Sequence, residues 1–170
     1  MQMVKKVFIV ILSIWLAILV FMPKKELYYA LEHQLEKNAI EINEKNIKEN
    51  LFGLDIKGAD IFYDGVKLAK ASDISFKTFL FYTKIDISKI DIDDSFKSMV
   101  PFRLNDINVT YSLLSPMRAN VYANGDFGDV AGYIDFNRTI HLDFVKVGNI
   151  KKLQRELKKT ENGWYYESKF

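Results

Sequence analysis

Hydrophobic residues follow three different patterns along this chain, and each pattern predicts a different structure. From Val7 to Met22 no residue is charged, and most are large and apolar. Between residues 23 and 38 leucines recur every four positions, and beyond that segment apolar and polar residues alternate. The patterns predict a transmembrane signal anchor over 1–22, an amphipathic leader helix over 23–38 and a β-rich domain over 39–170.

The uncharged run of the first segment has 16 residues, fewer than the roughly 20 that usually cross a bilayer. Lysines at both ends can extend to the headgroups, and a thinned bilayer shortens the distance to be crossed. A cleaved signal peptide is the alternative, but it needs small residues after its apolar core, where this chain has Phe21, Met22 and Pro23. We therefore expect an uncleaved anchor. Its expected membrane contacts are Val7, Phe8, Ile11, Trp15, Leu19 and Met22.

The direction of the anchor depends on the basic residues beside it. Lys5, Lys6 and the N-terminal amine precede the apolar run, whereas Lys24 and Lys25 follow it. Basic residues favour the cytoplasmic side of a membrane. The small N-terminal excess predicts a cytoplasmic N-terminus and a domain on the outer side.

The leader segment carries Leu27, Leu31 and Leu35 on one helical face and charged residues on the others. This face either covers one end of a sheet or binds a partner. The alternation that follows predicts antiparallel strands with one buried and one wet face. The alternating apolar sets are Ile40 and Ile42; Leu54 and Ile56; Ile85 and Ile87; Ile90 and Ile92; Val109 and Tyr111; Val121 and Ala123; and Ile140, Leu142 and Phe144.

Three dipeptides predict hairpin turns: Asp64-Gly65, Asn124-Gly125 and Asn137-Arg138. The apolar positions also change phase near Gly58 and Ser88-Lys89, which predicts β-bulges and a bent sheet. The predicted fold class is therefore mainly β, with a curved antiparallel sheet of meander type and short N- and C-terminal helices beside the anchor. The concave apolar face of such a sheet must be covered by the helices, by a partner or by lipid.

The end of the chain predicts one more helix and one more strand. Ile150, Leu153 and Leu157 have helical spacing among basic residues. Asn162-Gly163 then leads into a final strand at Trp164–Tyr166.

Composition excludes most catalytic chemistry. The chain has no cysteine, and the 148 residues after the anchor carry 22 basic and 22 acidic side chains, so the charge surplus of a nucleic-acid binder is missing. No phosphate-binding loop, dinucleotide motif or catalytic triad pattern is present, and His33 and His141 lack a second ligand at metal-binding spacing. We expect no catalytic residue, no metal, no other cofactor and no enzymatic activity.

Phe79, Leu80, Phe81 and Tyr82 form the longest apolar block outside the anchor. Four consecutive large residues cannot all point to one face of a strand. They form either a strand buried on both faces, or a connection beneath the leader helix, or a patch that contacts lipid or a partner.

The layout of the whole chain resembles the N component of bacterial type II secretion systems and, more distantly, the AsmA-like envelope proteins. The resemblance rests on the anchor, the leader leucines, the hairpin Tyr63–Val66, the glycine-patterned stretch Gly125–Phe136 and the final Asn162–Glu167. It implies a single-pass inner-membrane protein with a periplasmic β domain. The implied function is a non-catalytic part of an envelope or secretion assembly, whose partners are the bilayer and other envelope proteins. The alternative is a lipid-binding module that holds phospholipid acyl chains on a concave apolar face.

Overall fold

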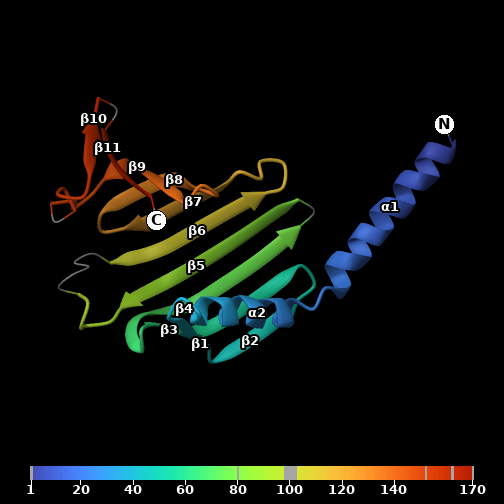
Figure 1. Cartoon of the computed structure of the whole chain (residues 1–170), viewed down its shortest axis with the longest axis horizontal. Helices are drawn as coiled ribbons and strands as arrows, with labels where there is room; N and C mark the ends of the chain where they lie inside the picture. Colours follow the sequence, from blue (N-terminus) through green and yellow to red (C-terminus); the bar gives the residue numbers. More distant parts are fainter. Residues whose placement is uncertain (1, 80, 98–102, 152, 162, 170) are drawn as a thin grey trace.

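The computed structural model places two helices before a single large β-sheet (Figure 1). It describes residues 2–79, 81–97, 103–151, 153–161 and 163–169, without the side chain of Leu19. The helices are α1 (Gln2–Phe21) and α2 (Lys24–Glu36). The strands are β1 (Ile40–Asn43), β2 (Asn46–Asn50), β3 (Gly53–Tyr63), β4 (Val66–Phe79), β5 (Tyr82–Ile92), β6 (Leu104–Ser112), β7 (Arg118–Gly125), β8 (Gly128–Asp135), β9 (Thr139–Val147), β10 (Lys158–Thr160) and β11 (Gly163–Lys169).

The leader helix is confirmed as α2, and it starts directly after Pro23, a residue that helices accept at their beginning. The segment predicted to be a membrane anchor forms the helix α1, whose apolar side chains are exposed along most of its length. Within the part of the chain that the structure describes, no helix combines the length and apolar character needed to cross a membrane. The transmembrane part of the predicted fold class therefore has no support from the fold.

The sheet is mainly a meander of antiparallel strands, as the alternation predicted. Its order is β1-β3-β4-β5-β6-β7-β8-β9-β11-β10, and β2 pairs with the other half of β3. The path is open and the strands twist along it, so that β10 and β11 point in a very different direction from β3 to β5 in Figure 1. The predicted curved antiparallel sheet is therefore confirmed.

The predicted changes of phase occur at two breaks in strand pairing. Gly58 and Lys89 have φ values of 67° and 55°, and each is skipped in the ladder that its strand forms with β4. The register is the same on both sides of each break, because one residue is skipped on both strands. The prediction of a β-bulge at these positions is therefore wrong, although a local reversal of the faces is present. Register shifts occur at Ile61/Phe62, Leu104/Asp106 and Asp129/Val130.

Two local predictions near the C-terminal half need correction. The described residues of 150–157 form turns, so the predicted C-terminal helix is wrong. An isolated stretch this short cannot hold a helix by propensity, and its apolar side chains pack on the sheet from a turn instead. The turn predicted at Asn124-Gly125 lies two residues later, at Asp126 and Phe127, because Phe127 is drawn into the core. The hairpin at Asp64-Gly65 is confirmed, and both turn residues have positive φ.

Candidate functional site

One face of the sheet is apolar from end to end, because the strand registers align their hydrophobic residues. Consecutive Cα partners connect Ile56, Ile74, Ile87, Ile107, Ala123, Val130 and Phe144 across seven strands. A second row connects Leu54, Phe76, Ile85, Val109, Val121, Gly132, Leu142 and Tyr166 across eight strands. We call the surface formed by these two rows the apolar face.

The opposite face of the sheet is polar in the same registers. One row there connects Asp55, Ser75, Asp86 and Asn108. Ser75 Oγ donates a hydrogen bond of 2.7 Å to Asp55 Oδ1, and this bond together with one from Asn50 holds the pKa of the Asp55 carboxyl below its usual range. The sheet thus has one wet and one apolar side, as the sequence predicted.

Helix α2 covers the apolar face at its β1–β4 end (Figure 1). Tyr28 is only 6% exposed and packs with Leu54, Ile56 and Ile74. Its hydroxyl lies 3.4 Å from Glu44 Oε2, and burial together with the Glu44 carboxylate raises the pKa of the Tyr28 phenol. The phenol therefore stays protonated and can donate to Glu44.

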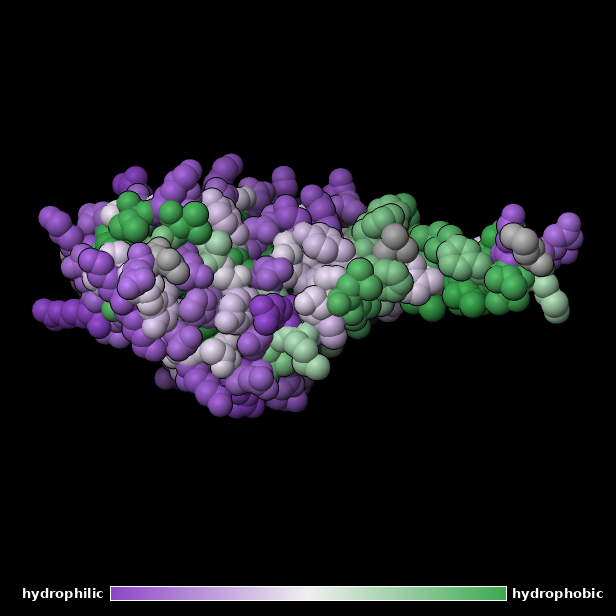
Figure 2. All heavy atoms as spheres, turned by 90° about the horizontal axis from the view of Figure 1, so that it is seen from above, coloured by the Kyte–Doolittle hydropathy of each residue, from purple (hydrophilic) through white to green (hydrophobic). Residues whose placement is uncertain are grey.

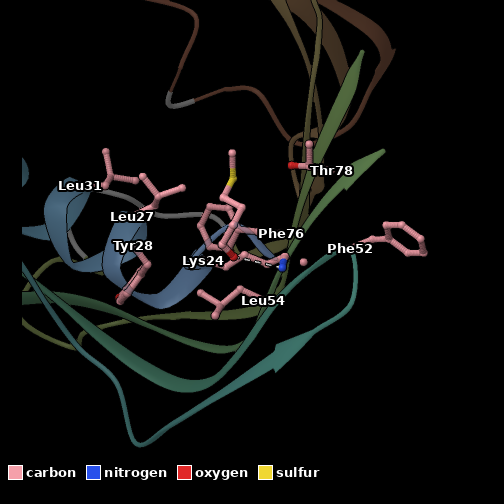
Figure 3. Close-up of a pocket in the computed structure, with 10 residues that line it drawn as sticks. Lys24, Leu27, Tyr28, Leu31, Phe52, Leu54, Phe76 and Thr78 are labelled. Carbon is pink, nitrogen blue, oxygen red and sulfur yellow. Dashed lines mark hydrogen bonds between the residues drawn. The ribbon is translucent and has the colours of Figure 1, made fainter. Parts of the chain in front are cut away.

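A cavity of about 190 Å³ lies between α2 and the sheet. Figure 3 shows Leu27 and Leu31 of α2 around it, together with Leu54 and Phe76 of the strands. Met22, the residue that follows α1, also lines this cavity. For comparison, an apolar cavity of ~150 Å³ is large enough to bind benzene. The cavity therefore places space for an apolar ligand directly beside the end of α1.

The described residues of 150–157 cover the apolar face at its other end. Ile150 is buried, and it forms a core cluster with Phe127 and Val130 against which Leu153 and Leu157 pack. A second cavity of about 320 Å³ lies beneath this segment, and Leu104, Leu142 and Phe144 are among its mainly apolar lining residues. The tail thus acts as a second partial cover.

The middle of the apolar face is not buried. Among the described residues, β5, β6 and β7 contribute no buried side chain, although each of these strands has neighbours on both sides. Ile85 and Ile87 of β5 still pack against the cluster beneath α2, and Ala123 of β7 packs against the cluster at the other end. Ile107, Val109 and Val121 lie between these two clusters and are half-buried. Burying apolar surface stabilises a protein by about 25 cal/mol per Å², so further cover over this stretch would add to the stability of the folded chain.

The block Phe79–Tyr82 forms the tip of the β4–β5 hairpin. Phe79, Phe81 and Tyr82 are about half exposed, and Leu80 lies outside the described residues. The alternative of a strand buried on both faces is therefore wrong. The Phe81 ring instead contacts Trp15 of α1, with 5.4 Å between the ring centroids.

The other predicted anchor residues lie on α1 or directly after it. Val7, Phe8 and Ile11 are exposed, as is Met22, while the side chain of Leu19 is outside the described ones. Lys24 fixes the end of this helix, because its Nζ lies 3.4 Å from the Val20 carbonyl oxygen and 3.7 Å from Glu49 Oε1.

The polar face of the sheet carries a histidine, His141, opposite Tyr133 and Glu167 on the neighbouring strands. His141 stacks between Tyr133 and Tyr165 and lies within 3.3 Å of Glu167 and Asp143 oxygens. Glu167 also contacts Lys158, and its hydrogen bonds to His141 and Lys158 lower the pKa of the Glu167 carboxyl. Within the described parts of the chain, no group of three or more His, Cys, Asp or Glu side chains could hold a metal ion.

Comparison with known proteins leaves this geometry as the main evidence for function. No family model, no curated protein and no solved structure matches the chain. The apolar rows could not be predicted from the sequence, because alternation identifies the faces of single strands and not their alignment in the sheet.

Proposed function

We propose that this protein is a non-catalytic, membrane-anchored module that holds phospholipid acyl chains on its apolar face. The observation that carries the proposal is the open middle of that face: the apolar rows cross β5, β6 and β7 without a buried side chain, and Ile107 and Val109 of β6 lie between the clusters at its two ends. An acyl chain is a suitable occupant because burial of each methylene contributes roughly 0.8 kcal/mol.

The anchor in this proposal is α1, placed in the bacterial inner membrane with the β domain in the periplasm. Its support is the uncharged run Val7–Met22, the exposed apolar side chains of the helix and the lysines on both sides. The run is short for a span, so the proposal requires those lysines to reach the headgroups and the bilayer to thin locally.

The position of the cavity under α2 supports lipid as the occupant. Met22, directly after α1, lines this cavity. An acyl chain that leaves the bilayer beside α1 would therefore enter a space lined by apolar side chains. Leu54 and Phe76 line the same cavity and begin the second apolar row. A continuous apolar path therefore connects the proposed anchor with the middle of the sheet.

A second candidate function is docking of another envelope or secretion protein, as the resemblance to the type II secretion N component implies. The exposed edge strands favour it, since all three residues of β10 and most of β2 are exposed. Such edges can pair with an added strand of a partner.

Native mass spectrometry of the full chain extracted in mild detergent tests the proposal. We expect a phospholipid adduct on the wild-type protein and its loss in Val109→Glu, which places a carboxylate in the middle of the apolar face. Thr110→Glu is the matched control, because Thr110 lies on the polar face opposite Lys84, and it should keep the adduct. Circular dichroism checks that both variants are folded.

A wild-type mass without a phospholipid adduct, or an adduct that both variants retain, would contradict lipid binding on this face. Recovery of a crosslinked envelope protein from cells with wild-type chain, together with a bare mass, would favour the docking function.

A further inference from the structure

The hairpin tips at one rim of the sheet carry exposed large apolar side chains. In an antiparallel meander every second turn lies at the same rim, which here brings together the β2–β3, β4–β5, β6–β7 and β8–β9 turns. Leu114, Met117 and Phe136 are 82%, 72% and 69% exposed at these tips. Leu51, Phe52 and Phe81 add to them. We call this set of tips the hairpin rim.

The turns at the opposite rim have a different chemistry. Asp64, Asp94 and Asp126 lie at or near the β3–β4, β5–β6 and β7–β8 connections. The large apolar residue of the β7–β8 turn, Phe127, packs into the core. Tyr63 and Val66 beside the β3–β4 turn are 53% and 50% exposed, less than Leu114, Met117 and Phe136, so the most exposed large apolar side chains among the described turns lie at the hairpin rim.

The hairpin rim lies at the end of the domain from which α1 emerges. Figure 1 shows α1 leaving the domain near the β2–β3 and β4–β5 turns, and the contact between Trp15 and Phe81 joins the helix to the rim directly. Figure 2 shows hydrophobic atoms along α1 and at the adjoining end of the domain, whereas most of the remaining visible surface is hydrophilic apart from one patch at the far end. Only Met22 and Pro23 separate α1 from α2, so this end stays close to whatever holds α1.

Basic side chains lie among the apolar tips of the hairpin rim. Arg118 and Arg138 lie beside the exposed tips of the β6–β7 and β8–β9 turns. Apolar side chains flanked by basic ones suit the boundary between acyl chains and anionic headgroups.

We infer that the hairpin rim inserts into the headgroup and upper acyl layer of a lipid bilayer. This inference rests on the proposed attachment of α1 to the same membrane. The rim then gives the domain a second contact with the bilayer, which fixes its orientation and brings one end of every long strand to the lipid. The edge of the apolar face at the hairpin rim would thus be in direct contact with the membrane.

Single-cysteine labelling tests the inference, because the chain has no native cysteine. The full chain carries an environment-sensitive fluorophore at Leu114→Cys or Met117→Cys, in vesicles of phosphatidylcholine and phosphatidylglycerol with brominated acyl chains. We expect these labels to lose most of their fluorescence. Asp64→Cys, at the opposite rim, should be unaffected, and Ile14→Cys in α1 serves as the positive control.

The controls separate failure of the inference from failure of the proposed attachment. Quenching at Ile14→Cys without quenching at either tip overturns the rim inference and leaves the anchor intact. Absence of quenching at Ile14→Cys contradicts the anchor, and the rim inference falls with it. Addition of Phe81→Asp to the Leu114→Cys chain should reverse most of the tip quenching with an unchanged circular dichroism spectrum. Full tip quenching in that variant would refute the contribution of the β4–β5 tip.

Discussion

Replacement of isoleucine by alanine at two positions of one apolar row should distinguish its covered end from its open middle. Ile56 in β3 and Ile107 in β6 belong to the same row, with the two strands β4 and β5 between them. Ile56 is 1% exposed beneath α2, whereas Ile107 is half-buried in β6. The two substitutions remove the same carbon atoms from different surroundings.

The expected magnitudes follow from burial. Ile56→Ala loses the full transfer free energy of its methylene and methyl groups and leaves a cavity, so the free energy of unfolding should fall by about 3 kcal/mol, within the ~2–5 kcal/mol range of such substitutions. Ile107→Ala loses only part of the transfer free energy of the removed groups, at roughly 0.8 kcal/mol per buried group, and leaves no enclosed cavity. We expect a loss of about 1 kcal/mol.

Urea unfolding of the full chain in mild detergent, followed by far-ultraviolet circular dichroism, measures both values. The slope of the unfolding free energy against urea should be the same in both variants, since the exposed area on unfolding hardly changes. Phospholipid added to the detergent should enlarge the loss for Ile107→Ala, because a ligand that binds only the folded state adds to its stability. Equal losses for the two variants without lipid would refute the reasoning, since they would mean that the middle of the face is as well covered as its end.

Three further predictions concern single contacts. Tyr28→Phe should lower the free energy of unfolding by less than about 1 kcal/mol, because only the 3.4 Å contact with Glu44 is lost. Tyr28→Ala should lower it by about 3–5 kcal/mol, because it opens the core under α2. Urea unfolding of both variants measures these values, and equal losses would contradict the prediction. Asp55→Asn should lower the free energy of unfolding at neutral pH and reduce its decrease in acid. The folded pKa of Asp55 lies below the unfolded value of about 3.9. The stabilisation by the Asp55 carboxylate is therefore present above that pH and is lost as the pH falls through the folded pKa. Urea unfolding from neutral pH to pH ~3 measures how the free energy of unfolding depends on pH. The same dependence in the variant as in the wild type would exclude Asp55 as its source. Gly132→Ala should destabilise by about 2 kcal/mol or more, because its Cβ would lie 1.9 Å from the His141 carbonyl oxygen; Gly65→Asn, in a turn with φ of 73° and free space, is the control and should unfold nearly as the wild type.

Much of the local structure could be predicted because it depends on short-range periodicity. The leucines of α2 at a spacing of four identify a helix, and alternation within each strand identifies its two faces. Asp64-Gly65 requires a tight hairpin because both residues accept positive φ. The tail at 150–157 had a helical pattern as well, but packing on the sheet outweighed a weak local preference, and the described residues there form turns.

The candidate site was only partly predictable. The sequence identified Phe79–Tyr82 as a notable apolar block, but the location of the turn decided that Phe81 lies at an exposed tip against Trp15. Leu114 and Phe136 had no distinguishing pattern, since single apolar residues in loops are common. They became part of one surface only when every second hairpin turn was brought to the same rim.

By itself, then, the amino-acid sequence determined most of the helical and extended segments, outside the turns at 150–157, and which side of each strand is apolar, because these properties depend on neighbours a few residues apart. The tertiary structure alone decided how the strands pair and where the covers end. Rows such as Ile74, Ile87 and Ile107 arise from register between strands, and an error of one residue in register would turn one strand's apolar side chains to the wet face. The open middle of the face exists because α2 and the tail cover only its two ends, and their reach depends on packing between segments distant in the chain.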